Sequence, residues 1–593
     1  MLVRARDLAR HASAACRLAL LALALLTLMT SCRCATGEGP RASRDAQGTS
    51  RPNGPDTAAS TCACRDRLAP LPFGPIADAR GPARARTGPS RPLTSVLETE
   101  PLHLLPMLRP DLSAFRVVGH SILEPLLRVD AATGRLEPVL AERWEATDGG
   151  RVLTFHLRHG VRFHDGRPLT SADVRFTFDR LLDPTVQAAS QRSDFERLNR
   201  VETPDDHTVV LRFREPHFLV YQNLDKLFIL PRHVYGVGDL NTHAALRSPV
   251  GTGPFRFVRW VAGERIEVAR FAGYWGTPAR APRLVHRIVT DSNAAFDLAL
   301  RGDVDVVTRL LPEHVERIER GEQRDRLRLV PTPASGYSFL TYNLRTPALA
   351  DPRIRRAIGH FLDRDAIHCA LDRCLSRAAR SPFLAGHALD VERPEPRFDP
   401  AAGTRLLDQT GARDSDGDGI RDLGVHPLRF TLLVPSTSRS LHRQVELLQQ
   451  RLRAVGVRMD IRPAEWGALL TRLSEHDYEA AALQWSIDPE TDLYPLFHSS
   501  QIEGGQNYGS VRDADVDRLL EEARRTLDAE RRNGLLRQLL ARLDAIAPYT
   551  YLASTFRVAV VRRDVSGLVA EPWGFRPWTL SQGHPSDVRA GDA

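Results

Sequence analysis

Lysine is almost absent from this sequence of 593 residues, in which Lys226 is the only one among 81 Lys and Arg residues. A phosphate-binding loop of the Gly-x-x-x-x-Gly-Lys-[Ser/Thr] type needs a lysine after glycine, and the context of Lys226, NLDKLF, has no glycine. Schiff-base chemistry would depend on the same side chain, whose charged form the adjacent Asp225 favours. Because the His-Glu-x-x-His and Gly-x-Ser-x-Gly motifs are missing as well, the sequence excludes phosphate-loop ATPases and gives an enzyme little support.

Long apolar runs are equally scarce, and the one that occurs lies near the N-terminus. Four arginines precede the run LALLALALLTLM at positions 18–29. A basic segment followed by an apolar run of this length is typical of a secretory signal, since a membrane-spanning helix needs ~20 apolar residues. No later stretch approaches that length. We therefore expect residues 1–31 to form a signal peptide.

The residues that follow this run, Met29-Thr30-Ser31-Cys32, resemble the lipobox of bacterial lipoproteins, whose cysteine is lipidated and becomes the mature N-terminus. An ordinary signal with a chance cysteine is the alternative. Residues 41–90 contain 12 Gly and Pro and few large apolar residues. Such a segment cannot bury enough surface to offset its ordering entropy. We expect residues 32–90 to be a disordered tether, anchored to a membrane through Cys32.

The charge is concentrated in the same N-terminal part. The formal net charge is +8, and residues 1–90 hold 13 Arg against 6 acidic residues, which accounts for +7 of it. The remaining residues hold 68 basic and 67 acidic side chains. A folded part this close to neutrality has no general surface for a polyanion, so no nucleic-acid partner is expected.

Cysteine usage indicates no zinc site. The seven cysteines include two Cys-x-Cys pairs in the expected tether, with no histidine nearby. Cys369 and Cys374, in IHCALDRCLS, could form a local disulfide in an oxidising compartment. The alternative is two small core residues on one helix, where such positions are poorly placed for a bridge.

Alternating and helical patterns begin near Arg91. The segments 151–163 and 208–215 alternate as half-buried strands, on either side of a helix over 171–182 with Ser171 as its N-cap. His164-Asp165-Gly166 looks catalytic but is better interpreted as a turn held by side-chain hydrogen bonds. A helix over 440–456 is followed by an alternating segment, an α/β unit.

Near the C-terminus, residues 513–548 predict two amphipathic helices, ended by Pro548. The apolar segment TYLASTFRVAVV (550–561) is expected to return to a sheet. These patterns together predict an α/β fold with at least two lobes.

A loop at 414–422, DSDGDGIRD, resembles the beginning of a calcium site. Asp414, Asp416, Asp418 and Asp422 stand at positions 1, 3, 5 and 9, with glycine at position 6. Position 12 is Val425 instead of the bidentate glutamate. A solvated, Gly-rich loop is the favoured interpretation, and weak structural Ca²⁺ is the alternative. No other cofactor is expected.

Four blocks follow one another in a characteristic order: FHDGRPLTSADVRFTFDR (163–180), VGTGPFRFVRWVAGERIEVARFAGYWG (250–276), ALRGDVDVV (299–307) and NLRTPALADPRIRRAIGHFLDRDAI (343–367). Together they resemble the bacterial extracellular solute-binding proteins of family 5, the oligopeptide- and dipeptide-binding group of ABC importers. The resemblance extends from about Glu98 to Trp578.

This resemblance implies a two-lobed periplasmic-binding-protein-like clamp with an extra inserted subdomain and two hinge crossovers. Lobe I would comprise about 91–332 together with the segment 553–593, which returns to it and ends in a C-terminal tail. The inserted subdomain would lie near 129–248. Lobe II would comprise 333–552. The crossovers near 333–336 and 551–554 would act as hinges around a ligand enclosed between the lobes.

The resemblance also suggests ligand contacts. Trp485 and Asp488 match a Trp and Asp of the peptide-binding relatives, in which the Asp pairs with the α-amino group of the ligand. Alternatively, Asp488 caps a turn before Pro489 and Trp485 belongs to the core. Glu100 lies in a loop that resembles the "E-P-x-x-L-x-P" segment, and Tyr337 and Ser338 could meet an extended ligand backbone.

The function that follows is that of a lipid-anchored, periplasmic or cell-surface binding protein. It would be a monomer that captures a small peptide and delivers it to an ABC permease in the cytoplasmic membrane, without catalysis. The same fold binding an oligosaccharide, opine or metal chelate is one alternative, since only a ligand with a free amine needs Asp488. A ligand sensor that is not coupled to import is another, and a secreted peptidase has the least support.

Overall fold

The computed structural model describes residues 74–75, 91–130, 135–334, 336–371, 375–384, 387–394, 396–486, 491–571 and 574–582. The expected signal peptide, Cys32 and Asp488 lie outside these residues. Of the expected tether, Gly74–Pro75 form β1 and pair with β24 (Val569–Glu571), so the expectation of disorder is wrong for these two residues. Backbone pairing with a strand does not require the apolar side chains that this segment lacks.

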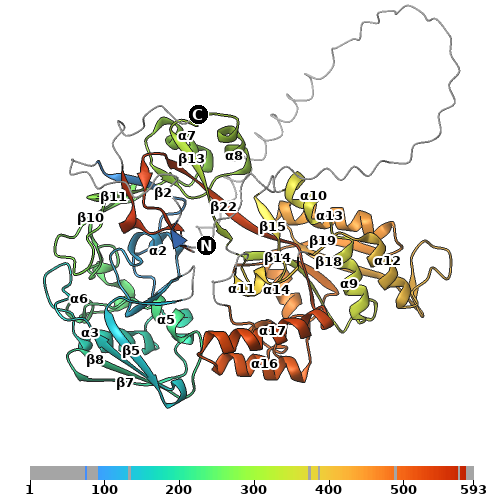
Figure 1. The fold of residues 1–593 in the computed structure, drawn as a ribbon, viewed down its shortest axis with the longest axis horizontal. Helices are drawn as coiled ribbons and strands as arrows, with labels where there is room; N and C mark the ends of the chain where they lie inside the picture. The colour runs from blue at the N-terminus through green and yellow to red at the C-terminus, as the bar shows by residue number, and fades with distance from the viewer. Residues whose placement is uncertain are drawn as a thin grey trace, which may run out of the picture. The chain divides into compact units, whose positions relative to one another are not determined.

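Lobe I is built on an eight-stranded sheet (Figure 1). Its strands follow the order β13-β22-β12-β2-β11-β10-β9, and β15 pairs with β22 off this path. β2 lies parallel to β11 and β12, whereas β22 is antiparallel to its neighbours. The strands are β2 (Leu93–Leu97), β9 (Phe255–Val261), β10 (Arg265–Arg270), β11 (Arg283–Ile288), β12 (Val306–Val307), β13 (Leu327–Ala334), β15 (Ser376–Ala378) and β22 (Ala553–Arg562). The main helices of this lobe are α2 (Leu112–Val118), α7 (Ser292–Arg301) and α8 (Pro312–Glu319).

A four-stranded antiparallel sheet forms the inserted subdomain, in the order β5-β6-β8-β7. The alternation predicted over 151–163 is confirmed in β6, where every second side chain is buried, and the strand ends at Leu157, just before the turn expected at His159-Gly160. Gly160, in the turn that follows, has a φ of 77°, which glycine adopts without strain. The elements are β5 (Ala141–Thr147), β6 (Val152–Leu157), β7 (Leu198–Asp205), β8 (Thr208–Phe213), α3 (Ser171–Leu182), α4 (Ala189–Ser193), α5 (Val220–Lys226) and α6 (Arg232–Tyr235), with the short pair β3 (Leu127–Val129) and β4 (Leu136–Pro138) beside them.

The helix predicted over 171–182 is confirmed residue for residue, but its N-cap is Thr170 and not Ser171. Asp173 accepts hydrogen bonds from the Thr170 backbone and hydroxyl, at 3.0 and 3.2 Å. Ser171 already has helical geometry, and its hydroxyl donates to the Asp205 carbonyl instead. The cap prediction was therefore one residue late.

The turn interpretation of His164-Asp165-Gly166 agrees with the contacts of these residues. The His164 ring bonds to the backbone of Gly251 and Gly253, at 3.2 and 3.0 Å. Asp165 pairs with His233 and accepts from the Arg167 backbone. The motif thus ties the inserted subdomain to the segment that leads into β9.

Lobe II is built on a five-stranded sheet in the order β19-β18-β20-β14-β21. The predicted α/β unit is confirmed: α13 connects β18 to the parallel strand β19 and buries Leu441, Val445, Leu448 and Leu452. The strands are β14 (Gly336–Tyr342), β18 (Arg429–Pro435), β19 (Arg458–Ala464), β20 (Ala480–Ser486) and β21 (Tyr549–Tyr551). The helices are α9 (Pro352–His360), α10 (Arg364–Ala366), α11 (Ala388–Val391), α12 (Pro400–Gln409), α13 (Arg439–Arg453), α14 (Trp466–Ser474), α15 (Tyr494–Phe497), α16 (Ala514–Arg525) and α17 (Ala529–Ile546).

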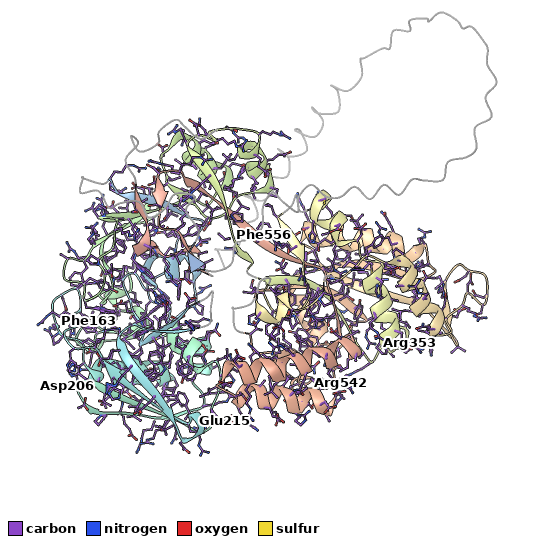
Figure 2. All side chains as sticks on the ribbon, viewed as in Figure 1. Phe163, Asp206, Glu215, Arg353, Arg542 and Phe556 are labelled. Atoms are coloured by element: carbon purple, nitrogen blue, oxygen red, sulfur yellow. The ribbon has the colours of Figure 1, made fainter. Side chains whose placement is uncertain are left out.

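The predicted C-terminal helix pair is confirmed as α16 and α17, which lie side by side in Figure 1. The next segment, expected to return to a sheet, contributes to two. β21 belongs to the sheet of lobe II and β22 to that of lobe I. The reverse passage occurs between β13 and β14. Figure 2 labels Phe556 on β22, close to the point where the chain passes between the sheets.

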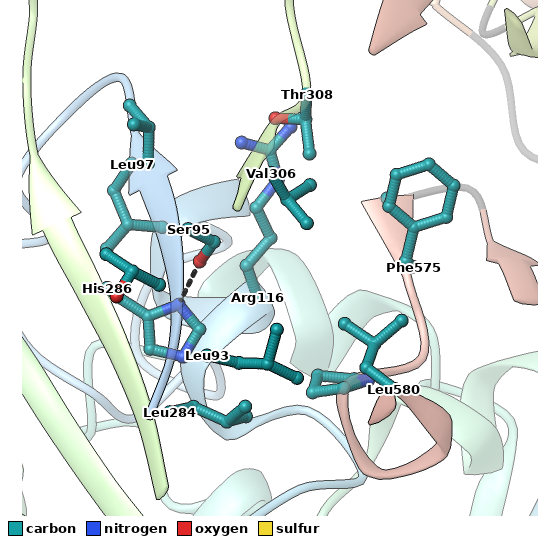
Figure 3. A pocket seen from close by; sticks show the side chains of 14 residues that line it. Leu93, Ser95, Leu97, Arg116, Leu284, His286, Val306, Thr308, Phe575 and Leu580 are labelled. Atoms are coloured by element: carbon teal, nitrogen blue, oxygen red, sulfur yellow. Dashed lines mark hydrogen bonds between the residues drawn. The ribbon is translucent and has the colours of Figure 1, made fainter. Parts of the chain in front are cut away.

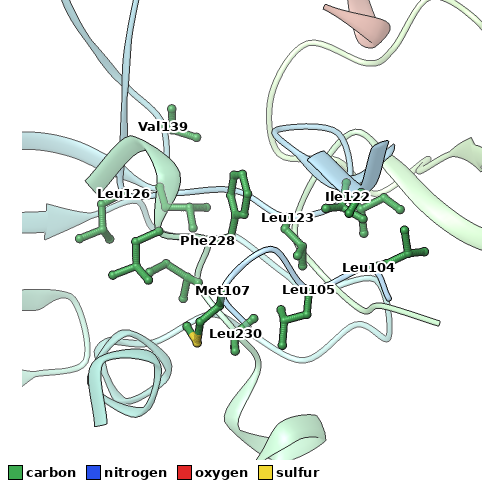
Figure 4. Close-up of a cluster of buried hydrophobic side chains, with 14 of the residues drawn as sticks. Leu104, Leu105, Met107, Ile122, Leu123, Leu126, Val139, Phe228 and Leu230 are labelled. Atoms are coloured by element: carbon green, nitrogen blue, oxygen red, sulfur yellow. The ribbon is translucent and has the colours of Figure 1, made fainter. Parts of the chain in front are cut away.

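The largest apolar core joins the lobe I sheet to the inserted subdomain. Figure 4 shows part of it, where Leu105, Met107 and Leu123 meet Phe228 and Leu230 from a distant part of the sequence. Burying one such leucine or phenylalanine fully stabilises the fold by about 1.5–3 kcal/mol. None of the helices in the described part of the chain has both the length and the apolar character needed to cross a membrane.

Candidate ligand-binding edge

The sheets of the two lobes carry polar and aromatic residues at the ends where the chain crosses between them. In lobe I, the parallel strands β2 and β12 both end at this edge, and β22 begins beyond it. Ligands of α/β proteins commonly bind at the carboxyl ends of parallel strands. We call these ends the hinge edge, which comprises residues 98–100, 308–309 and 553–557 of lobe I and 336–338, 485–486 and 551 of lobe II.

An ion pair organises the lobe I part of the hinge edge. Glu98, which directly follows β2, pairs with Arg116 of α2 and accepts a 2.9 Å hydrogen bond from the Thr308 hydroxyl. Burial alone would raise the pKa of Glu98, but Arg116 and Thr308 outweigh it and hold the pKa below its usual value. Glu98 is therefore a carboxylate whose charge is already balanced.

Arg557 of β22 lies near this pair and is half-buried. Burial lowers its pKa, the nearby Arg116 and Arg309 lower it further, and Glu98 opposes the effect. Its side chain makes no ion pair with any residue that the structure describes. Our sequence analysis missed Arg557, although an arginine that interrupts the apolar run TYLASTFRVAVV was a visible signal.

Glu100 is exposed, and both its carboxylate oxygens are engaged. They accept hydrogen bonds from the Trp260 indole at 2.8 Å and from the Gly263 backbone at 3.0 Å. Glu100 thus holds the loop after β2 against the β9–β10 hairpin. Its suggested ligand contact stays a prediction.

Aromatic residues dominate the lobe II part of the hinge edge. Tyr337 of β14 stands opposite Trp485 of β20 in the antiparallel ladder. The Tyr337 ring packs edge-on against Tyr551, with centroids 5.6 Å apart, and Phe339 stacks on Trp485 at 6.0 Å. Two of the predicted contact residues, Tyr337 and Trp485, are therefore neighbours.

The hydroxyl of Tyr337 is buried and makes no hydrogen bond to any residue that the structure describes, and the side chain is only 1% exposed. Burial raises its pKa well above 10, so the hydroxyl keeps its proton. An unsatisfied buried hydroxyl costs about 1–3 kcal/mol. A ligand acceptor placed next to it would recover part of this energy.

Ser338, the following residue, is engaged within the fold. Its hydroxyl bonds to the backbone of Ala553 as both donor and acceptor, at 3.2 Å each, and lies 3.5 Å from Gln444. The residue is 6% exposed. These bonds fasten β14 to the start of β22, where the chain has just crossed between the lobes.

The calcium candidates do not all come together. Ligand oxygens of Asp414, Asp416 and Asp418 lie within 4.8 Å of one another, but Asp422 is not part of this group. Asp422 accepts bonds from Ser415, which lower its pKa. Asp414 accepts from the backbone of Gly417 and Gly419, at 2.7 and 3.0 Å. The loop thus uses its own carboxylates to cap its turns, and weak calcium binding stays an open alternative.

Cys369, in the π-helical turn Ile367–Leu371, is disulfide-bonded. Of the two interpretations left open by the sequence, this excludes a pair of free core cysteines. Cys374 lies outside the described residues.

A separate, small apolar pocket of about 50 Å³ lies under β2 in lobe I (Figure 3). It contains the pair Ser95 and His286, whose hydroxyl oxygen and Nδ1 lie 2.9 Å apart. Burial and the charge of Arg116 lower the pKa of His286 to about 4. A histidine with this pKa is a weak base at neutral pH, so the pair is poorly suited to activating a serine nucleophile.

Comparisons with known proteins agree with this architecture. The model of the bacterial extracellular solute-binding proteins, family 5, matches residues 135–504. The oligopeptide-binding protein AppA of Bacillus subtilis is 27% identical over 423 residues, which cover 70% of this chain and 77% of AppA. The dipeptide-binding protein of Escherichia coli is 28% identical over 475 residues, covering 76% and 86% of the two chains.

A solved structure shows the same fold with a different kind of ligand. NikA from Brucella suis, in complex with Fe(III)-EDTA, is 22% identical and superposes with a TM-score of 0.71, covering 83% of this chain and 100% of NikA. The family match covers more than half of the sequence. This chain therefore belongs to the bacterial extracellular solute-binding proteins of family 5.

Proposed function

We propose that this protein is the substrate-binding component of an ABC importer, that it captures peptides at the hinge edge, and that it delivers them to a permease in the cytoplasmic membrane. Relatives named as oligopeptide- and dipeptide-binding proteins support this function. One observation carries it: the described residues provide no ion-pair partner for the half-buried Arg557 guanidinium in lobe I and no hydrogen-bond acceptor for the Tyr337 hydroxyl in lobe II. A peptide carries matching acceptors in its carboxylate and carbonyl groups.

Hinge closure would complete such a site. The two sheets are connected by the passages between β13 and β14 and between β21 and β22, so a bend at both would bring the lobes together around a ligand. Closure would remove water from the donors and strengthen their bonds to the ligand. The protein would bind and release its ligand unchanged, without catalysis.

Asp488 is proposed as the partner of the peptide's α-amino group, with Trp485 beside it. We expect Asp488→Asn to weaken binding of a free-amine peptide by about 10- to 100-fold, the range for loss of a charged hydrogen bond. The affinity for an N-acetylated form of the same peptide should change little on this substitution. Calorimetry measures both affinities. Asp477→Asn, at a side chain that is 70% exposed, is the matched control. Equal losses of affinity for both peptides would exclude Asp488 as the partner of the α-amino group.

The ligand class is tested by native mass spectrometry of gently purified protein. Peptides of several masses should dissociate from it. Release of a single saccharide, opine or metal chelate would instead support the alternative that the same fold binds such a ligand. A protein of similar fold has been solved in complex with Fe(III)-EDTA. A ligand sensor without transport is distinguished by peptide uptake in cells, which deletion of the gene would leave unchanged.

The proposed location is outside the cytoplasmic membrane, with Cys32 as the site of a lipid anchor. The family is extracellular by description, and the arginine-rich segment with its apolar run at 18–29 supports export. A palmitate analogue should label the wild-type protein and not Cys32→Ser. Equal labelling of both would refute the anchor.

A further inference from the structure

A basic cavity lies at the β21 edge of the lobe II sheet. It has a volume of about 280 Å³ and lies between α9, the C-terminal end of α17 and described residues of the segment 380–397. Six arginines line it, namely Arg355, Arg356, Arg364, Arg380, Arg393 and Arg397. The only carboxylate among its described lining residues is Asp544. The cavity therefore has a large surplus of positive charge in a protein whose folded part is close to neutral.

Two of these arginines are deeply buried and form no ion pair with a carboxylate that the structure describes. Arg355 and Arg364 are 3% and 6% exposed. Arg355 donates to the carbonyls of Leu349, Ala350, Ile546 and Ala547, and Arg364 donates to those of Gly359 and Tyr551. These neutral partners satisfy the N–H groups but do not neutralise the charge, which for Arg355 is offset only in part by the nearby Asp351. Burial accordingly lowers the pKa of both guanidinium groups to about 10.

The carboxylate of the lining and two carboxylates outside it already pair with single arginines. Asp544 pairs with Arg393 at 2.6 Å. Outside the cavity, Asp351 pairs with Arg353 at 2.6 Å and Glu392 with Arg537 at 2.7 Å. The C-terminal end of α17 contributes about half a negative charge, which is less than the surplus.

Arg356 and Arg397 are the exposed arginines of the basic cavity. Both are exposed, and neither forms an ion pair with a residue that the structure describes. Their guanidinium groups are thus available at the cavity, next to the two buried charges. Guanidinium forks match the oxygens of phosphoryl groups in geometry as well as charge.

We propose that the basic cavity binds a phosphoryl group as a dianion, with Arg356 and Arg397 as direct ligands and Arg355 and Arg364 supplying the favourable field. The phosphoryl group would come from a soluble phosphate or from the head group of a phosphatidate lipid. Tyr551 is the one lining residue that also belongs to the hinge edge. The proposal does not depend on which solute the hinge edge takes.

The test uses the purified protein and two probes at constant ionic strength. Inorganic phosphate is titrated by calorimetry, and flotation is measured with vesicles of phosphatidylcholine alone or with added phosphatidate. The variant Arg356→Ala with Arg397→Ala removes two exposed side chains, and its fold is checked by circular dichroism. Arg439→Ala with Arg443→Ala, on the exposed face of α13, removes the same charge outside the cavity and is the matched control.

We expect wild type and control to bind phosphate saturably with a millimolar or lower Kd, and the cavity variant to bind at least tenfold more weakly. Binding to phosphatidate vesicles without binding to free phosphate would identify the lipid as the source. Binding of free phosphate would identify a soluble ligand. If wild type binds neither probe, or if the cavity variant binds as tightly as the control, the proposal is overturned.

Discussion

Buried histidines show how single residues make this fold sensitive to acid. His164 accepts the Gly251 N–H at Nδ1 and donates from Nε2 to the Gly253 carbonyl, so its neutral form fits the turn and its protonated form would aim a second N–H at a donor. Burial is the main reason that its pKa falls to about 4. His217 and His286 are likewise held neutral, with pKa values of about 3 and about 4.

We predict that acid weakens the fold through these residues. The pKa of histidine in the unfolded chain is about 6.5, so below this pH His164 binds a proton in the unfolded chain but not in the folded protein. The free energy of unfolding should therefore fall from pH 6.5 towards pH 4. His164→Asn should reduce the slope of that decline by up to about 1.4 kcal/mol per pH unit. Urea denaturation at a series of pH values measures it. The exposed His426→Asn is the control, and an unchanged slope in the His164 variant would refute the role.

At the scale of elements, the residues that cap a turn decide whether the turn is free to bind something else. The 414–422 loop places three carboxylates together, yet each also accepts a backbone hydrogen bond: Asp414 from two glycines, Asp416 from Asp418 and Asp418 from Ile420. Calcium sites need six to eight oxygens around the ion, including a bidentate acid, and Val425 stands at that twelfth position.

We therefore predict that millimolar Ca²⁺ leaves the protein unchanged. Calorimetry should show no saturable heat, and the melting temperature should shift by less than about 1 °C, since a ligand must bind the native state to raise it. Asp416→Asn should melt at the same temperature as wild type in either condition. A saturable calcium shift that Asp416→Asn abolishes would establish the metal site instead.

For the whole molecule, a contact away from the crossovers also connects the two lobes. Leu527, between α16 and α17, packs against the apolar core of lobe I. The Phe218 backbone donates to the Arg524 carbonyl at 2.9 Å, and Arg532 lies over the Phe218 ring at 4.8 Å. This contact joins the inserted subdomain to the α16–α17 helix pair, so hinge opening would have to break it.

We predict that Leu527→Ala favours the open arrangement. Losing a half-buried leucine contact of about 1 kcal/mol should weaken ligand binding about fivefold and enlarge the radius of gyration of the ligand-bound protein in solution scattering. Leu535→Ala, which removes a comparable side chain within the core of lobe II, should lower stability and leave affinity unchanged. If Leu527→Ala binds like wild type, the contact does not take part in closure.

Much of the fold was predictable because the relevant signals are local. The periodicity of α3, α13, α16 and α17 and the alternation of β6 depend on residues within one or two turns of each other. The site was predictable only in part. Trp485 and Tyr337 were predicted as contact residues and lie together. Arg557 becomes a candidate only through its proximity to Arg116 and Glu98, which are more than 400 residues away in the sequence.

By itself the sequence determined the family and the α/β class, since these reside in ordered motifs and short-range periodicity. Only the tertiary structure decided which strands pair on either side of the second crossover, where β21 joins β14 and β22 joins β13, because periodicity says that a segment is a strand but not which strand it pairs with. It also decided where charge accumulates. The arginines of the basic cavity are scattered from 355 to 397 among acidic residues in the sequence, and folding directs those acids to other partners.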